Sequence, residues 1–163
     1  MKWRQMHPAD LDAVVAIAGR VHPDFPEERD IFADKLSLHA GGALVLESGA
    51  AVAGYCFAHP WHGTQPAPLN TLLGAIPASA DALYLHDLAL LPETQGAGAG
   101  TAAIAILLAK AASLRLERLC LVAVNGSMPF WSRHGFVVTD SAALRTKLAS
   151  YGAEARFMVR AAG

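Results

Sequence analysis

Cysteine is scarce in this sequence, where only Cys56 and Cys120 occur among 163 residues. Both fall in segments predicted as strands, and a cysteine there behaves as a small buried hydrophobic side chain. A disulfide framework of the kind that holds small secreted domains together is therefore not indicated. Free thiols are typical of a reducing compartment, so we expect a cytoplasmic protein.

An excess of charge of one sign is also lacking, because 13 Lys and Arg are balanced by 14 Asp and Glu. Without a basic tract, we expect no nucleic-acid partner and no membrane surface as a partner. The longest apolar stretch stops at Lys110 and is too short to cross a bilayer. Lys2 and Arg4 are followed by Asp10 and Asp12, which is unlike a signal peptide.

The sequence also lacks the residue spacing that is typical of a metal site. His22, His59, Trp61 and His62 fall in segments predicted as loops, where they could form a metal site or an acceptor pocket. They show no close spacing of His, Cys and Asp residues, and we interpret them as solvated loop side chains. We therefore expect no metal.

Apolar residues are plentiful, at 53% of the chain, which is enough for one core in a single domain spanning residues 1–163. The predicted strands span residues 3–5, 43–47, 51–58, 83–91, 118–124, 136–139 and 155–160. Helices are predicted from residue 8 to about 19, from 27 to about 39, at 98–116 and at 127–134. Segment 59–80 is expected to be a long loop of the functional or mobile kind, and segment 141–151 has no clear pattern. This order predicts an α/β fold with a mixed sheet and helices on both faces.

The rest of the chain is arranged around Leu83–Leu116. A strand is followed by a loop with glycine at every second position, Gln95–Thr101, and then by a helix with apolar residues at helical spacing. A glycine-rich turn that opens a helix leaves backbone N–H groups unpaired, and the helix dipole adds positive partial charge there. The loop is therefore predicted to bind a phosphate group.

Two nucleotide-binding patterns fit this loop poorly. The P-loop requires a lysine before its Ser or Thr, and Gly100-Thr101 has none. The dinucleotide fingerprint requires G-x-G-x-x-G, with an acidic residue about 20 positions further on. Here the spacing is G-x-G-x-G, Glu117 precedes the next predicted strand and Asn125 ends it.

A third pattern fits better. The loop resembles Gln/Arg-x-x-Gly-x-Gly/Ala, the acyl-CoA pyrophosphate loop of the GNAT superfamily of acyl-CoA-dependent N-acyltransferases. As in that family, an apolar-x-Pro segment, Leu90-Leu91-Pro92, comes before it. A second segment, Asn125–Phe136, is similar to the family's element of Asn, two aromatic residues and Gly-Phe. The resemblance extends from Trp3 to Arg160.

The resemblance implies a mostly antiparallel three-layer fold in which a central parallel strand pair, Leu83–Leu91 and Arg118–Val124, splays apart and admits CoA. It implies acetyl-CoA as the acyl-donor substrate. Asn125 would hydrogen-bond the pantetheine arm, or alternatively cap the following helix. The residues implied to bind acyl-CoA lie at the strand end, in the loop and in the second segment: Leu88, Ala89, Leu90, Gln95, Gly96, Ala97, Gly98, Ala99, Gly100, Thr101, Asn125, Phe130 and Trp131.

His86 is the candidate general base. It lies in an otherwise apolar strand, ten residues before Gly96, where family members with a known carboxylate base often carry that group. Imidazole titrates near neutral pH, as a base for an amine requires. A satisfied core histidine, or one that only binds substrate, is an equally supported interpretation. Asp87 is expected on the opposite face of a regular strand, where it anchors structure or orients a neighbour.

Trp131 is a departure from the family pattern. It stands where many members have a tyrosine proposed as the acid for the departing thiolate, and an indole N–H cannot serve as that acid. We expect Trp131 to pack the wall of the cleft. Ser127, Tyr84, Tyr151 or water would then supply the proton.

Four acidic residues offer a further alternative. Asp24, Glu27, Glu28 and Asp30 could attract a cationic amine. We first interpret them as the acidic first turn of the second predicted helix, where they favour the helix dipole.

Three functions are consistent with these patterns. The first is transfer of an acetyl group from acetyl-CoA to a primary amine of a small molecule or peptide. The second is a non-catalytic acyl-CoA-binding module, which the replacement of tyrosine by Trp131 would suit. The third is an acyltransferase with a longer acyl donor or a hydroxyl acceptor. The sequence leaves the acceptor and a homodimeric state open.

Overall fold

The computed structural model describes residues 1–163 and contains one seven-stranded sheet, in the order β1-β2-β3-β4-β5-β7-β6. All neighbouring strands are antiparallel except β4 and β5, which are parallel. The predicted mixed, mostly antiparallel sheet with one central parallel pair is therefore confirmed. The strands are β1 (Lys2–Gln5), β2 (Ala43–Ser48), β3 (Ala51–Trp61), β4 (Ala82–Leu90), β5 (Arg118–Ala123), β6 (Val137–Val138) and β7 (Arg156–Ala161).

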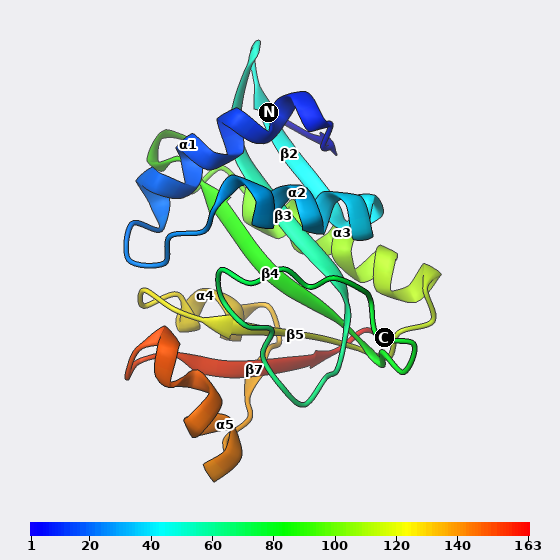
Figure 1. Ribbon diagram of the computed structural model, residues 1–163. Helices are drawn as coiled ribbons and strands as arrows, with labels where there is room; N and C mark the ends of the chain where they lie inside the picture. Colours follow the sequence, from blue (N-terminus) through cyan, green and yellow to red (C-terminus); the bar gives the residue numbers. More distant parts are fainter.

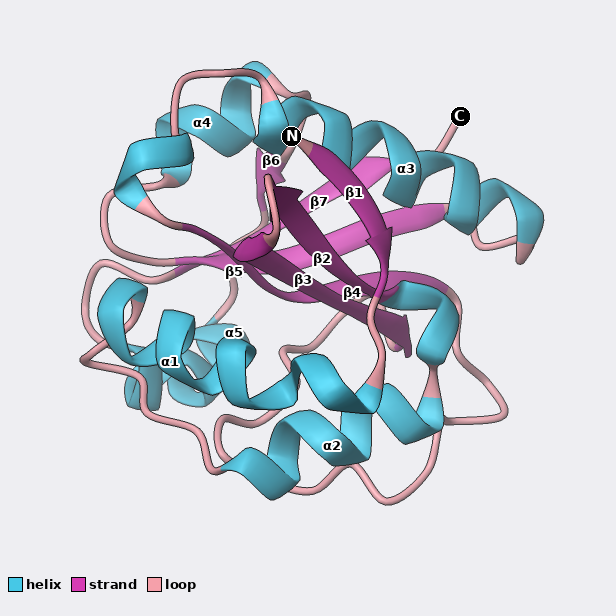
Figure 2. Cartoon of the chain, turned by 90° about the horizontal axis from the view of Figure 1, so that it is seen from above, coloured by secondary structure: helices cyan, strands magenta, loops and turns pink.

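Helices cover both faces of the sheet, as predicted. Figure 2 shows α3 and α4 on one face and α1, α2 and α5 on the other. The helices are α1 (Leu11–Val21), α2 (Arg29–Leu38), α3 (Ala99–Ser113), α4 (Met128–Arg133) and α5 (Ala142–Leu148). Short 3₁₀ turns occur at Pro8–Asp10, Ala40–Gly42, Pro92–Thr94 and Ala149–Tyr151.

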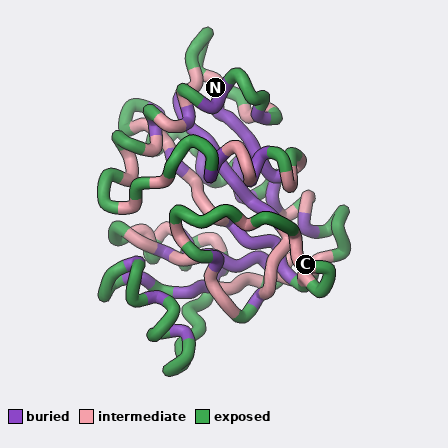
Figure 3. The backbone as a smooth tube through the Cα atoms, in the orientation of Figure 1, coloured by how far each residue is buried: buried purple, intermediate pink, exposed green.

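Three apolar clusters hold these layers together. α3 packs on one face through Ile104 and Leu107, with Trp131 from α4 in the same cluster. α1 and α2 pack on the other face around Tyr55 and Phe57, and α5 packs beside them against Tyr84, among others. The sheet is accordingly the most deeply buried part of the chain (Figure 3). Each helix thus packs against one face of the sheet only.

α3 is shorter than the predicted helix. The helix ends at Ser113, and Leu114, which lies inside the predicted range of 98–116, is exposed. Arg115 has a positive φ of 57°, a left-handed backbone that closes the helix before β5. The helix is therefore ended by its turn, although the apolar pattern continues.

β3 is longer than the predicted strand and corrects two expectations. It continues through His59 and Trp61, so neither residue lies in a loop, and His59 is only 1% exposed. β3 pairs with β4 along this extension, Trp61 opposite Ala82. The expected loop therefore begins after Trp61, and it crosses the face of the sheet that α2 also covers (Figure 1).

An irregularity in β4 corrects the expected position of Asp87. The β3–β4 register pairs Phe57 with Asp87 but Ala58 with Leu85, so His86 is an extra residue in β4. Such a bulge turns two consecutive side chains to the same side of a sheet. His86 and Asp87 therefore both face the side of α1 and α2, where a regular strand would separate them.

Candidate functional site

The glycine loop turns sharply into α3. Gly96 and Gly98 have φ angles of 79° and 82°, a left-handed conformation that side-chain-bearing residues rarely adopt. The first helical bond runs from Ala102 N–H to the Gly98 carbonyl at 3.0 Å, and the N–H groups of Ala97 and Gly98 donate to no backbone acceptor. Free N–H groups at the positive end of a 15-residue helix make a favourable position for an anion.

Side chains hold the loop in this shape. Gln95 Nε2 donates to the Leu90 carbonyl at 3.1 Å, and Trp3 Nε1 from β1 donates to the Ala99 carbonyl at 2.9 Å. A Cβ on Gly100 would lie 2.9 Å from Cζ of Phe130, so the third glycine allows α4 to pack closely on α3. Gln95 therefore supports the loop through its amide and brings no charge to a phosphate.

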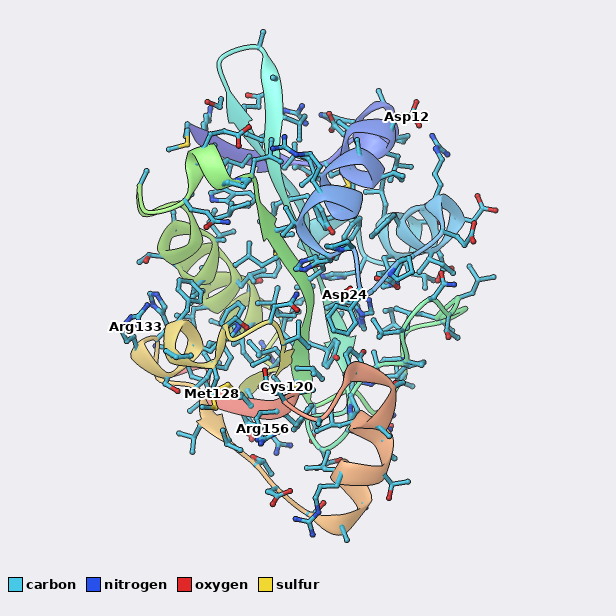
Figure 4. The ribbon with its side chains drawn as sticks, turned by 90° about the vertical axis from the view of Figure 1, so that its left-hand side faces the viewer. Asp12, Asp24, Cys120, Met128, Arg133 and Arg156 are labelled. Atoms are coloured by element: carbon cyan, nitrogen blue, oxygen red, sulfur yellow. The ribbon has the colours of Figure 1, made fainter.

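A groove of about 580 Å³ opens over this loop, between the end of β4, the start of α3 and α4. Arg133 is its one Lys or Arg side chain, and Figure 4 shows Arg133 projecting outward from α4. His134 Nε2 lies 3.4 Å from Thr101 Oγ1. The lining residues are Val21, Leu88, Leu90, Gln95, Gly96, Gly98, Ala99, Gly100, Thr101, Ser127, Phe130, Trp131, Arg133 and His134.

The groove meets a gap between the two parallel strands. β4 and β5 pair only as far as Leu85 and Leu121, although both strands continue, and in Figure 1 they diverge beyond that point. Leu91 N–H donates to the Ala53 carbonyl of β3 at 2.9 Å. Because backbone groups alternate along a strand, the N–H groups of Leu88 and Leu90 face the gap. They are free to donate to an oxyanion there.

A second cavity of about 390 Å³ continues from the groove beyond this gap. Val21, Leu88, Gln95, Ser127 and Trp131 line both spaces, so the two form one cleft. The remaining lining residues of the second cavity are His22, Phe25, Glu27, Leu69, Leu85, His86, Asp87, Leu121, Val122, Val124, Asn125 and Tyr151.

His86 and Glu27 form a buried pair in this cavity. His86 Nε2 lies 3.1 Å from Glu27 Oε1, and the two side chains are 1% and 5% exposed. Burial opposes ionisation of Glu27, but His86 and Lys35 outweigh it and lower the pKa of Glu27 to about 2. An ionised Glu27 accepts a hydrogen bond from His86 Nε2, and the other ring nitrogen, Nδ1, is buried without a partner.

Asp87 and His22 form a second pair, one residue further along β4. His22 Nε2 lies 2.8 Å from Asp87 Oδ1, and Tyr55 donates its hydroxyl proton to Asp87 Oδ2. Burial favours neutral His22, but Asp87 outweighs it and raises the pKa of His22. Burial, with Asp87 adding to it, raises the pKa of the Tyr55 hydroxyl well above its usual value. The side chains of His22 and Asp87 are 19% and 13% exposed, so this pair is more accessible to solvent than the pair of His86 and Glu27.

Two further titratable side chains lie behind these pairs. Lys35 Nζ is 3.7 Å from Glu27 Oε2, and burial lowers the pKa of Lys35. The ring centroid of His59 lies 6.0 Å from that of His86, and burial together with His86 lowers the pKa of His59 to about 3. His59 is thus a neutral core histidine, which corrects its interpretation as a solvated loop residue.

The second segment of the resemblance, Asn125–Phe136, also contributes to the wall of the cleft. Trp131 is 7% exposed and packs in the core, with Nε1 donating to Ser127 Oγ at 3.2 Å. Because Ser127 accepts that bond, its own hydroxyl proton is free to point into the cleft. Ser127, rather than Asn125, is the N-cap position of α4, so the capping interpretation of Asn125 is wrong.

The structure gathers most of the predicted cofactor-binding residues around the groove, with three exceptions. Ala89 is fully buried in the cluster on the face of α1 and α2, and Ala97 is exposed and lines neither space. Asn125 lines the second cavity. The structure also shows Glu27 before the start of α2, buried in the site, so it does not belong to an acidic first turn of a helix.

Sequence reasoning named Glu27 and His22 as possible acceptor contacts but interpreted them as a helix-start residue and a solvated loop residue. Both lie in the connection between α1 and α2, where Figure 4 also shows Asp24, and the distance between them and β4 is set by tertiary packing. No group of three or more His, Cys, Asp or Glu side chains is arranged to hold a metal ion. No helix has the length and apolar character needed to cross a membrane.

Residues 8–136 match the model of the acetyltransferase (GNAT) family. The chain belongs to this family. No curated protein sequence matches it.

Solved structures share the fold at low sequence identity. A GNAT-like decarboxylase, GphF, in complex with isobutyryl-CoA is 20% identical with a TM-score of 0.79, covering all of both chains. The loading GNATL domain of CurA from Lyngbya majuscula is 13% identical with a TM-score of 0.81, covering 99% of this chain and 97% of that one. N-acetylglutamate synthase from Neisseria gonorrhoeae with coenzyme A and N-acetyl-glutamate is 20% identical, with a TM-score of 0.75, covering 99% of this chain but 35% of that one.

Proposed function

We propose that this GNAT protein transfers an acyl group from acyl-CoA, with acetyl-CoA as the expected donor, to a primary amine of a small molecule or peptide. The observation that carries the proposal is the continuous cleft. It joins a glycine loop with free N–H groups to a cavity that holds two histidine–carboxylate pairs. A pure acyl-CoA-binding module would have no use for titratable groups beyond the thioester position.

In this proposal the chain positions the donor and stabilises the oxyanion. The pyrophosphate binds the N–H groups of the loop at the start of α3, and the pantetheine arm runs through the gap between β4 and β5. The thioester carbonyl then lies beside β4, where Leu88 N–H faces the gap. When the amine attacks, that N–H donates to the developing oxyanion, which lowers the barrier.

His86 is the proposed general base. The amine must lose a proton as its nitrogen bonds to the carbonyl carbon, and His86 Nδ1 is a buried ring nitrogen of the cavity without a partner. Since the side chain is 1% exposed, the proton reaches it through a water that enters the cavity. The C–S bond then breaks, and the thiolate takes a proton from water, with the Ser127 hydroxyl free to hydrogen-bond to the sulfur.

Two alternatives remain testable within this site. His22, held by Asp87, is a second proton acceptor and is more exposed than His86. A longer acyl donor is favoured by one observation, the similarity to a structure solved with isobutyryl-CoA.

The proposal is tested by following free thiol release from acetyl-CoA, isobutyryl-CoA and octanoyl-CoA with a panel of primary amines. We expect amine-dependent release with formation of the N-acyl amine by mass spectrometry, and we expect it to be fastest with acetyl-CoA. Tight CoA binding without amine-dependent release from any donor would leave the binding-module function in its place.

A further inference from the structure

The second cavity differs in chemistry from the CoA groove. No Lys or Arg side chain lines it, and ten of its 17 lining residues are hydrophobic. Its carboxylates, Glu27 and Asp87, lie together on the side of β4. The nearest buried cation, Lys35, is 1% exposed behind Glu27 and does not line the cavity. An incoming acidic group would find no free cationic partner there.

Part of the cavity wall is apolar and only half-buried. Phe25, Leu69, Val122 and Val124 line the cavity and retain accessible surface, which an apolar ligand can cover. Leu69 belongs to the segment between β3 and β4, and that segment is tied to the site, because Asn70 N–H donates to Glu27 Oε2 at 3.0 Å. The apolar wall is therefore fixed relative to the carboxylates.

Two ring nitrogens of this cavity, His86 Nδ1 and His22 Nδ1, are buried and have no hydrogen-bond partner. His86 Nδ1 is fully buried and unpaired, in a side chain that lines the space beside Asp87. Buried polar atoms are rarely left unsatisfied, and such an atom next to an open cavity is a position for a ligand or water hydrogen. It marks the end of the cavity at which the amine group binds.

We propose that the acceptor is a primary amine carried on an apolar body, such as an aralkyl or alkyl amine, with no anionic group near the nitrogen. This inference rests on the proposed function and specifies its substrate class. The amine nitrogen lies at the His86 and Asp87 end, and the body lies against Leu69 and Phe25. A carboxylate on the acceptor would be buried without a partner beside two carboxylates. The cavity thus differs from a site for glutamate, whose N-acetyl product occupies the Neisseria gonorrhoeae structure.

The test compares 2-phenylethylamine, phenylalaninamide and phenylalanine as acceptors with acetyl-CoA. Phenylalaninamide and phenylalanine are nearly the same size, but only phenylalanine carries a negative charge, on its carboxylate. We expect kcat/KM for phenylalanine to be at least about a hundredfold below that for phenylalaninamide. In a series of butyl-, pentyl- and hexylamine, each methylene is expected to raise kcat/KM about fourfold. Equal rates for the matched pair, or no gain along the series, would overturn the inference.

A variant that adds a positive charge to the cavity separates the effect of charge on acceptor choice from the effect of a disturbed fold. Leu69→Lys places a cation on the apolar wall. We expect it to lower the ratio of kcat/KM for phenylalaninamide to kcat/KM for phenylalanine by about tenfold or more. Leu69→Met is the matched control and should leave that ratio unchanged. An unchanged ratio in folded Leu69→Lys would show that the charge of the cavity does not set the preference and would contradict the inference.

Failure of the proposed function is distinguishable from failure of this inference. If no amine releases thiol, calorimetry of the same three compounds with the CoA-bound protein still decides the inference. It predicts measurable binding of 2-phenylethylamine and phenylalaninamide and none of phenylalanine. Binding of phenylalanine as tight as that of phenylalaninamide would contradict the inference.

Discussion

Glu27 is the residue on which the buried charges of the site depend. It contacts His86 Nε2 at 3.1 Å and Lys35 Nζ at 3.7 Å, and it accepts a hydrogen bond from Asn70 N–H. Its carboxylate therefore orients the ring of His86, offsets the charge of Lys35 and holds the segment that carries Leu69. One side chain thus links the base, the core and the wall of the acceptor cavity.

We predict that Glu27→Gln lowers the free energy of unfolding by about 3–5 kcal/mol, because it leaves Lys35 charged and buried without a partner. Urea unfolding at pH 7 measures the change. The control is Glu28→Gln, at an exposed neighbouring position, which should change stability by less than about 0.5 kcal/mol. A loss no larger than that of the control would show that the buried pair contributes little.

We predict that His86→Gln lowers kcat/KM by about 10² to 10⁴ and removes the low-pH limb of its profile. A weakly basic amine should be the acceptor, so that its own ionisation does not add a second limb. The profile of His22→Gln, measured in parallel, should keep that limb. If instead the limb disappears in His22→Gln and persists in His86→Gln, the base is His22.

At the scale of elements, the start of α3 and the bulge in β4 build the site together. The helix start supplies N–H groups to the groove, and the bulge turns His86 and Asp87 to one side of the sheet. The glycine spacing and the periodicity of α3 made the first predictable from sequence. The bulge leaves no mark in a run of alternating residues, so Asp87 was assigned to the wrong face.

The helix start predicts a weak salt dependence of CoA binding. Arg133 is the one Lys or Arg in the groove, so backbone N–H groups carry most of the phosphate contacts. Between 0.05 and 0.5 M salt we expect the dissociation constant of CoA to rise by no more than about tenfold, because screening acts on few ion pairs. Arg133→Gln should flatten this dependence further. A much steeper rise would require several cationic contacts that the groove does not have.

For the whole molecule, the buried groups of the site predict acid sensitivity. His59 has its pKa lowered to about 3 by burial, from 6.5, and Glu27 has its pKa lowered to about 2, from 4.5. In both cases the unfolded chain takes up the proton first as the pH falls. Their stabilisation is therefore complete above about pH 6.5 and is lost as the pH falls towards 3 and then 2.

Thermal unfolding at a series of pH values between 7 and 4 measures this loss. We expect the free energy of unfolding to fall by several kcal/mol over that range. His22 acts in the opposite sense, because its raised pKa stabilises the fold below pH 6.5 and this contribution is lost as the pH rises. His59→Gln should make the melting temperature less dependent on pH between 6.5 and 4. A slope unchanged in that variant would assign the acid sensitivity to other groups.

Local periodicity and glycine spacing predicted most of the strands and the glycine loop, and the resemblance to the GNAT superfamily implied the parallel pair and the groove residues. The sequence did not predict the acceptor cavity. Glu27 and His86 are 59 positions apart, and only the packing of α2 against the sheet brings them together. His59 was misplaced for the same reason, since pairing with β4 extends β3 into a segment rich in proline and glycine.

The central claim is that the loop at the start of α3 binds acyl-CoA, and calorimetric titration of acetyl-CoA tests it most directly. Gly98→Val places a side chain on the loop, where φ is 82°. Gly74→Val introduces the same change at a φ of 72° in a loop outside the cleft, and it serves as the control for backbone strain. We predict that Gly98→Val weakens acetyl-CoA binding at least about a hundredfold while Gly74→Val binds as the wild type does. Wild-type affinity in a folded Gly98→Val protein would contradict the account.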